Sequence, residues 1–256
     1  MFKKNPPLLA GKLQRKDIKM LEITKNINAL NWQNISDEMN RTGYAVVAKF
    51  LTQEQCGRLL NMYDNKDGYR KTVVMERYRF GLGVYKYWDY PLPSLVNDMR
   101  KDLYPKLVPI ANLWMNLLNI HTRFPDTYSE LQAQCYAAGQ TKPTPLILKY
   151  GQGGYNTLHQ DLYGEVYFPI QAACFLNEPD EDYIGGEFVL TEQVPRAQSK
   201  AIVLRPKRGD MIIFTTNFRP VKGSRGYYRA NMRHGVSQVI SGDRHAVGII
   251  FHDAVN

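Results

Sequence analysis

The chain has 256 residues, of which 44% are hydrophobic, and this is enough for one substantial core or one core with a supporting layer. Lys and Arg total 33 against 24 Asp and Glu, a formal net charge of +9. This balance favours acidic partners such as nucleic acid or anionic metabolites, although a basic surface that aids solubility explains it equally well. No apolar run approaches the roughly 20 residues of a membrane span, and no block of like charges forms a nucleic-acid-binding tail.

Residues 1–140 are predicted to be mainly helical. Ser36 is expected to cap a short helix that ends at Gly43, and a strand follows over residues 44–50. The run over residues 93–119 has Leu, Val, Met and Trp at helical spacing, but Pro105 and Pro109 should break or kink it. Two further helices are expected, one after the capping box of Thr52 and Gln55 and one over residues 128–138 before Gly139.

From residue 141 onward, short apolar strands alternate with Gly and Pro turn signals. Many short strands with such turns predict a sandwich or a jelly roll. Periodicity alone therefore predicts a helical half followed by an all-β half. The expected strands cover residues 145–150, 165–176, 186–193, 201–206, 210–216 and 246–253.

The cysteines and the N-terminal residues bear on the cellular location. Cys56, Cys135 and Cys174 lie far apart without C-x-x-C spacing. We therefore expect neither a disulfide framework nor a zinc site, and a reducing cytoplasm is the expected location. The N-terminus is basic and contains prolines, but it lacks the apolar stretch of roughly 7–15 residues that a signal peptide has.

His159, Asp161 and His234 have the order of a metal site, H-x-D followed by a distal His. In a strand, residues i and i+2 point to the same side, so His159 and Asp161 can bind one ion. A third ligand from a remote strand would suit a site inside a barrel. Two imidazoles and a carboxylate can occupy one face of Fe(II) and leave positions for a co-substrate and O₂. A surface strand pair without a role is the alternative.

Arg244 strengthens the metal-site interpretation. It follows the turn Ser241-Gly242-Asp243, whose β-branched flanks predict a hairpin that returns past His234. A guanidinium there can form a bidentate pair with the far carboxylate of a dicarboxylate. His245 should face the opposite way, and His252 has the strand parity to line the pocket or to play a structural part.

Around these residues the chain resembles the Fe(II)/2-oxoglutarate-dependent dioxygenases, specifically their prolyl-hydroxylase-like branch. The matching segments are LILKYGQGGYNTLHQD, GGEFVL, KRGDMIIF and RHGVSQVISGDR. The HQDLYGE stretch is similar to a small bacterial family of such oxygenases whose label invokes oxidative repair of methylated DNA. The resemblance implies a mainly β fold, with a double-stranded β-helix (jelly-roll) catalytic core over residues 141–256. Residues 1–140 would pack on it as a helical support within one compact domain.

The resemblance also implies Fe(II), 2-oxoglutarate and O₂ as cofactors, with the triad as iron ligands and Arg244 as the anchor of 2-oxoglutarate. Tyr150 matches a family tyrosine that reaches the co-substrate, or else it fills the barrel mouth. The family often has a Tyr or Thr on the strand after H-x-D, where this chain has Cys174 and Phe175. Gln171 or Tyr163 could then be the second donor to the co-substrate.

A basic and aromatic segment leads into His234, and it is expected near the pocket rim. It comprises Arg219, Lys222, Arg225, Tyr227, Tyr228, Arg229 and Arg233. Arg225, Arg229 and Tyr227 in particular could hold phosphates and stack bases, or the segment is a solvated loop. A second such stretch, residues 69–90, could join this surface or form a solvated strand pair.

The expected activity is hydroxylation of a C–H bond of an unidentified substrate, coupled to decarboxylation of 2-oxoglutarate to succinate and CO₂. The substrate would be a protein side chain or a small metabolite. Oxidative demethylation of nucleic acid, with formaldehyde release, is the alternative. The R-x5-R signature of AlkB-type repair enzymes is missing, because Ile250 stands where its second Arg would be. A non-catalytic jelly-roll binding module is the third hypothesis. No membrane partner is expected.

Overall fold

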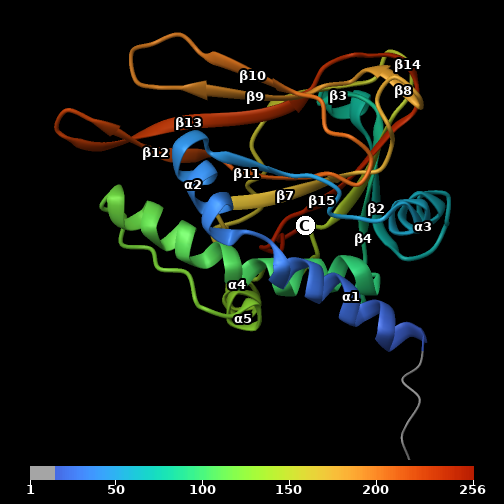
Figure 1. The fold of residues 1–256 in the computed structure, drawn as a ribbon, viewed down its shortest axis with the longest axis horizontal. Coiled ribbons are helices and arrows are strands. Elements are labelled where there is room, and N and C mark those ends of the chain that lie inside the picture. The colour runs from blue at the N-terminus through green and yellow to red at the C-terminus, as the bar shows by residue number, and fades with distance from the viewer. Residues whose placement is uncertain (1–14) are drawn as a thin grey trace, which may run out of the picture.

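The structure is a computed structural model that describes residues 15–256, with side chains from Glu22 onward. The basic, proline-containing N-terminal sequence lies outside the described residues. Two antiparallel sheets face each other, and helices pack against the outer side of one of them (Figure 1). No helix among the described residues is long and apolar enough to cross a membrane.

The larger sheet has seven strands in the order β1-β11-β7-β15-β5-β4-β2. The strands are β1 (Tyr44–Val47), β2 (Tyr69–Val74), β4 (Val84–Trp88), β5 (Leu146–Tyr150), β7 (Ile170–Phe175), β11 (Met211–Thr215) and β15 (Arg244–Ile249). The smaller sheet has the order β10-β9-β13-β6-β3, and β12 pairs with β13. Its strands are β3 (Gly81–Leu82), β6 (Tyr155–His159), β9 (Phe188–Gln193), β10 (Lys200–Leu204), β12 (Phe218–Gly223) and β13 (Gly226–Val236).

From β5 onward the chain passes repeatedly from one sheet to the other. The strands β5, β7, β11 and β15 belong to the larger sheet, whereas β6, β9, β10 and β13 belong to the smaller one. This alternation is the double-stranded β-helix, so the predicted fold class is confirmed. A short separate pair, β8 (Tyr183–Gly185) and β14 (Val239–Gly242), closes one end.

Alternating side chains of the larger sheet separate two cores. On β7, Ala172 and Cys174 pack toward the helices, while Ala173 and Phe175 face the smaller sheet. This period of two is what a strand buried on both faces requires. The helices are α1 (Arg15–Ala29), α2 (Trp32–Thr42), α3 (Gln53–Tyr63), α4 (Ser94–Leu117) and α5 (Tyr128–Ala137).

Two helix predictions need correction. Ser36 lies inside α2, and Asn31 caps that helix by accepting a hydrogen bond from the Asn34 amide at 3.0 Å. Helix α4 continues through Pro105 and Pro109. Its apolar side is buried between the sheet and α1, and this packing outweighs the two missing amide donors. The Gly43 stop, the Thr52–Gln55 capping box and α5 are as predicted.

The stretch over residues 69–90 contains a strand pair that is only partly exposed to solvent. Strand β4 pairs with β5 and β2 pairs with β4, so both extend the larger sheet. Tyr87 and Trp88 are buried. The first 140 residues therefore contribute strands as well as helices to the fold.

The predicted hairpin between His234 and Arg244 is wrong. His234 lies on β13 of the smaller sheet and Arg244 begins β15 of the larger one, with β14 between them. Gly242, at φ +80°, lies against the backbone of Asp182 where the chain crosses between the sheets. The two residues thus approach the interior from opposite sides.

Candidate active site

His159, Asp161 and His234 converge between the two sheets. His159 and His234 are direct cross-strand partners on β6 and β13, and their ring centroids are 4.1 Å apart. Asp161 follows just beyond the end of β6. Its carboxylate oxygens lie 3.6 Å from His159 Nε2 and 3.2 Å from His234 Nε2. One ligand atom from each residue lies within 4.8 Å of the others, so the three groups could hold one metal ion.

The protonation states suit a metal site. Burial opposes ionisation of Asp161, but the two imidazoles and a hydrogen bond from the Tyr163 hydroxyl (2.7 Å) hold its pKa well below the usual range. Burial, and then the charge of His234, lower the pKa of His159. His159 Nδ1 lies 2.8 Å from the Thr157 carbonyl oxygen, so Nδ1 carries the proton and Nε2 keeps a free lone pair. A carboxylate and a neutral imidazole are the forms that bind metals.

The triad borders a cavity of about 240 Å³ between the sheets. The lining is mostly aromatic and apolar, and small residues of β7 and β15 leave room inside the barrel. The residues that face the interior from the larger sheet include Tyr85, Tyr87, Leu146, Leu148, Tyr150, Gln171, Ala173, Phe175, Phe214, Arg244, Ala246 and Gly248. Such a cavity excludes water and can enclose a small anion beside the metal ligands.

Arg244 is the one Lys or Arg side chain among the described residues that line this cavity, and it is 2% exposed. Its guanidinium carbon lies 5.6 Å from the ring centroid of Tyr150 and 5.3 Å from that of Phe175. Among the described residues, no carboxylate lies within ion-pairing distance of it. Burial lowers the pKa of Arg244, partly offset by Tyr183 and Tyr150. A buried cation without an anion is costly, so the position favours an anionic ligand.

Tyr150 stands directly opposite Arg244 in the β5–β15 register. Its hydroxyl accepts a hydrogen bond from Asn156 Nδ2 at 3.2 Å, and its own proton is free to be donated. Burial raises the pKa of Tyr150 to about 12, so the hydroxyl is a neutral donor. The pair is therefore positioned to bind one carboxylate from two sides.

Tyr163 and Gln171, the two sequence alternatives for a further donor, are differently placed. The Tyr163 hydroxyl donates to Asp161 and accepts from Tyr87 at 3.2 Å, so it is occupied. Gln171 Nε2 is buried in the cavity wall without a hydrogen-bond partner among the described residues. Gln171 lies roughly 13 Å along β7 from Phe175, which contacts Arg244. It therefore presents a free donor away from the Arg244 end.

The basic segment before His234 does not reach the cavity. It forms the β12–β13 hairpin, which projects away from the barrel (Figure 1). Arg229 lies roughly 17 Å along β13 from His234, and Arg225 is at the tip, further still. Tyr227, Arg229 and Arg233 are exposed and alternate with residues that face inward. None of the three rim candidates lines the cavity.

Arg219, Arg229 and His245 contact residues outside the cavity. Arg219 is buried and forms an ion pair with Glu192 at 2.5 Å. Arg229 lies over the Phe218 ring at 4.8 Å. His245 packs against the Tyr63 ring on the far side of the larger sheet, facing away from Arg244 as expected.

The aromatic residues at the cavity mouth belong to the basic and aromatic stretch over residues 69–90, whose position the sequence left open. The 3-10 helix η1 (Met75–Tyr78) and the residues after it lie beside β6, because Phe80 O accepts hydrogen bonds from the amide and hydroxyl of Thr157. Phe80 lines the cavity and stacks on Tyr78 at 5.5 Å, and the two rings are 45% and 54% exposed. The run Arg77-Tyr78-Arg79-Phe80 is visible in the sequence, but no local pattern indicates that it lies at the cavity mouth.

A double-stranded β-helix whose interior holds two histidines, an aspartate and a buried arginine defines a 2-oxoglutarate- and Fe(II)-dependent oxygenase. Residues 83–254 match the model of a family described as "Oxygenase, catalysing oxidative methylation of damaged DNA", and the chain belongs to this family. Over 164 residues it is 48% identical to "Uncharacterized protein Rv2227" of Mycobacterium tuberculosis H37Rv and to "Uncharacterized protein MT2286" of strain CDC 1551, covering 64% of this chain and 70% of each relative.

Solved structures share the fold at low identity. A prolyl-4-hydroxylase from Pseudomonas putida superposes with a TM-score of 0.53 at 13% identity, covering 87% of this chain and all (100%) of that one. An oxidoreductase of the 2OG-Fe(II) oxygenase family from Burkholderia pseudomallei gives 0.51 at 12% identity, covering 90% and 95%. Enzymes of this class use Fe(II), 2-oxoglutarate and O₂, and the donor set described above fits these groups.

Proposed function

We propose that this oxygenase hydroxylates a C–H bond of a substrate held at the cavity mouth, with coupled decarboxylation of 2-oxoglutarate to succinate and CO₂. His159, Asp161 and His234 would hold the iron. Arg244 and Tyr150 would bind the far carboxylate of 2-oxoglutarate. The observation that carries the proposal is a buried guanidinium without a carboxylate partner in the same cavity as the triad.

When bound, iron and 2-oxoglutarate supply the oxidising chemistry. The chain's own residues hold and orient these groups. Tyr163 fixes one carboxylate oxygen of Asp161, and the Thr157 carbonyl fixes the ring of His159. The aromatic lining excludes water, which strengthens each of these polar contacts.

The proposal is tested by loading the protein with Fe(II) and 2-oxoglutarate under anaerobic conditions, adding O₂ and measuring succinate together with substrate mass. Succinate should form only when Fe(II), 2-oxoglutarate and O₂ are all present. A substrate that is hydroxylated should gain the mass of one oxygen atom. The His159→Ala variant should form none. Absence of succinate from the iron-loaded wild-type chain across a broad substrate panel would contradict the oxygenase assignment and favour a binding module.

Oxidative demethylation of nucleic acid is the second candidate, because the same chemistry on an N-methyl group releases formaldehyde. The family description, the net charge of +9 and the cavity mouth support it. At the mouth, the stacked rings of Tyr78 and Phe80 alternate with Arg77 and Arg79. Exposed rings stack on bases at about 1–3 kcal/mol per base, and cations contact phosphates.

A methylated single-stranded oligonucleotide distinguishes the two candidates. On the second, it should bind with salt-dependent affinity and yield formaldehyde, and Tyr78→Ala with Phe80→Ala should weaken binding at least tenfold by the stacking estimate of about 1–3 kcal/mol per base. Tyr227→Ala, an exposed tyrosine on the hairpin away from the cavity, is the matched control and should bind as the wild type does. Equal loss in the control, or no binding at all, would leave a protein or metabolite substrate.

A cytoplasmic location is also part of the proposal. Cys56, Cys135 and Cys174 are all buried, free thiols, which agrees with a reducing compartment.

A further inference from the structure

The loop of residues 161–168 carries the aspartate of the triad. It joins β6 to β7 and contains no helix or strand. Its backbone groups therefore need partners outside a regular ladder. Because Asp161 and Tyr163 both belong to it, whatever fixes this loop also fixes the carboxylate.

Gln140 binds the middle of the loop through its side-chain amide. Its Nε2 donates to the Val166 carbonyl at 2.8 Å, and its Oε1 accepts from the Val166 amide at 2.8 Å. Gln140 is fully buried, and its Nε2 also donates to the Asp253 carbonyl at 2.5 Å. A Cβ at Gly164 would lie only 2.3 Å from the Gln140 amide carbon, so the loop passes too close for any side chain there.

His252 binds the end of the loop. Its Nδ1 accepts a hydrogen bond from the Phe168 amide at 3.1 Å, so the ring proton sits on Nε2. The ring is buried, and its centroid lies 6.0 Å from that of Tyr163, two residues after Asp161. His252 thus lies against residues near both ends of the loop.

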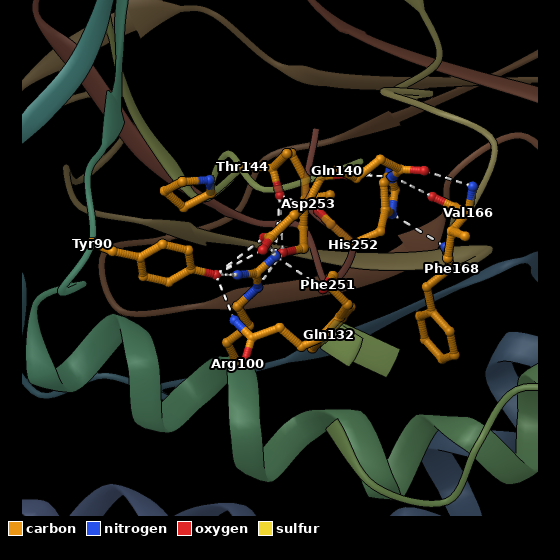
Figure 2. A network of polar contacts seen from close by, with 12 residues as sticks. Tyr90, Arg100, Gln132, Gln140, Thr144, Val166, Phe168, Phe251, His252 and Asp253 are labelled. Carbon is orange, nitrogen blue, oxygen red and sulfur yellow. Dashed lines mark hydrogen bonds and ion pairs between the residues drawn. The ribbon is translucent and has the colours of Figure 1, made fainter. Parts of the chain in front are cut away.

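A polar network holds these two residues in place (Figure 2). Arg100 of α4 donates to the Ile250 and Phe251 carbonyls at 2.8 and 2.9 Å and pairs with Asp253 at 2.6 Å. The Thr144 hydroxyl donates to the His252 carbonyl. Figure 2 shows the Gln140 and His252 side chains extending from this network toward Val166 and Phe168.

We propose that Gln140 and His252 are positioning residues that set the loop so that the Asp161 carboxylate stands between His159 and His234. They transmit the rigidity of α4 and the segment over residues 250–253 to a loop that has no ladder of its own. The inference rests on the proposed role of Asp161 as an iron ligand.

The test measures metal affinity rather than turnover. Co(II) is titrated into metal-free protein and followed by its visible absorbance. Gln140→Met and His252→Phe should each weaken Co(II) binding by about tenfold, the low end of the loss seen when groups that orient metal ligands are removed. Backbone amides of residues 161–168 should exchange with deuterium faster. Gln132→Met, the same change at a glutamine that donates to Tyr90 in the same network without touching the loop, should leave Co(II) affinity unchanged.

Two further variants separate positioning from general loss of structure. His252→Asn places an amide oxygen near the position of Nδ1, so it should accept the Phe168 amide and restore most of the affinity that His252→Phe loses. Gln140→Asn keeps a buried amide but withdraws it from Val166, so it serves if Gln140→Met does not fold. Unchanged Co(II) affinity in the folded Gln140 and His252 variants, or equal loss in Gln132→Met, would overturn the inference. Asp161→Ala tests the premise: if it kept full affinity, the iron-ligand role would fail instead.

Discussion

Replacing Arg244 by Met should weaken ligand binding without lowering the stability of the ligand-free protein. The side chain is buried, lines the cavity and has no carboxylate partner among the described residues. Removing one member of a buried charge pair costs on the order of 2–5 kcal/mol. At about 1.4 kcal/mol per tenfold, Arg244→Met should weaken 2-oxoglutarate binding by roughly 30- to 3000-fold. Arg244→Lys should fall between, because a point charge replaces a two-pronged donor.

Without 2-oxoglutarate, the same substitution should leave the free energy of unfolding unchanged or raise it, since it removes a buried, unpaired charge. At 2-oxoglutarate 100 times its wild-type Kd, the ligand should stabilise the wild type by about 2.7 kcal/mol and the variant by less than about 1 kcal/mol. Arg100→Met is the matched control. It strands Asp253 in the interior, so it should cost on the order of 3–5 kcal/mol with or without the ligand.

Two anaerobic measurements on the Fe(II)-loaded protein test these expectations: titration of 2-oxoglutarate, followed by absorbance, and urea unfolding with and without 2-oxoglutarate. Iron content should not change, because Arg244 is not among the metal-binding groups. Two other cations near these strands are not placed to bind the co-substrate: Lys149 pairs with Asp243 at 2.8 Å, and Arg233 is exposed on β13. An unchanged 2-oxoglutarate affinity in Arg244→Met would therefore refute the assignment of this cavity as the co-substrate site.

Three further outcomes are expected. Asp161→Ala should lose most of its iron in a metal analysis of the purified protein, and full occupancy would contradict the triad. Tyr163→Phe removes a charge-assisted hydrogen bond from that carboxylate, so metal affinity in a Co(II) titration should fall by about tenfold or more, with little change in unfolding. Burial and the charge of Lys149 lower the pKa of His245 to about 4. Between about pH 6.5 and pH 4 the unfolded chain therefore binds a proton that the folded chain does not. The free energy of unfolding should fall over this range by up to about 1 kcal/mol per pH unit. In His245→Phe the free energy of urea unfolding should depend less steeply on pH over this range, and an equal pH dependence would contradict the assignment to His245.

The triad could be predicted because its geometry is local. The spacing of His159 and Asp161 predicted that both side chains reach one ion, although only His159 belongs to a strand and Asp161 lies in the loop just beyond it. Arg244 lines the cavity as predicted, but the chain reaches it by a different route, since the expected hairpin is a crossing between sheets. The position of Arg244 beside Tyr150 depends on pairing between β5 and β15, which no local pattern encodes.

The prediction that the basic segment before His234 lies at the pocket rim was wrong. Nearness to His234 in sequence suggested nearness to the cavity, but a strand rises about 3.3 Å per residue, so a few residues carry a side chain out of reach. The mouth is instead formed by Phe80, brought there when β3 paired with β6. That contact joins segments far apart in the sequence. The predicted break at the two prolines of α4 was wrong for a related reason, because tertiary packing outweighed a local preference.

Arg100 and Arg244, both fully buried, show how the fold separates support from function. Arg100 is 0% exposed, and it has a carboxylate, a phenol and backbone carbonyls as partners. Arg244 is 2% exposed, and its Nε, like Gln171 Nε2 in the same cavity, has no hydrogen-bond partner among the described residues. A chain selected only for stability would satisfy or replace such groups, because each unpaired buried polar atom costs on the order of 1–3 kcal/mol. Arg244 and Gln171 line the same cavity, so the cost of these two groups falls in the space that an anionic ligand would fill.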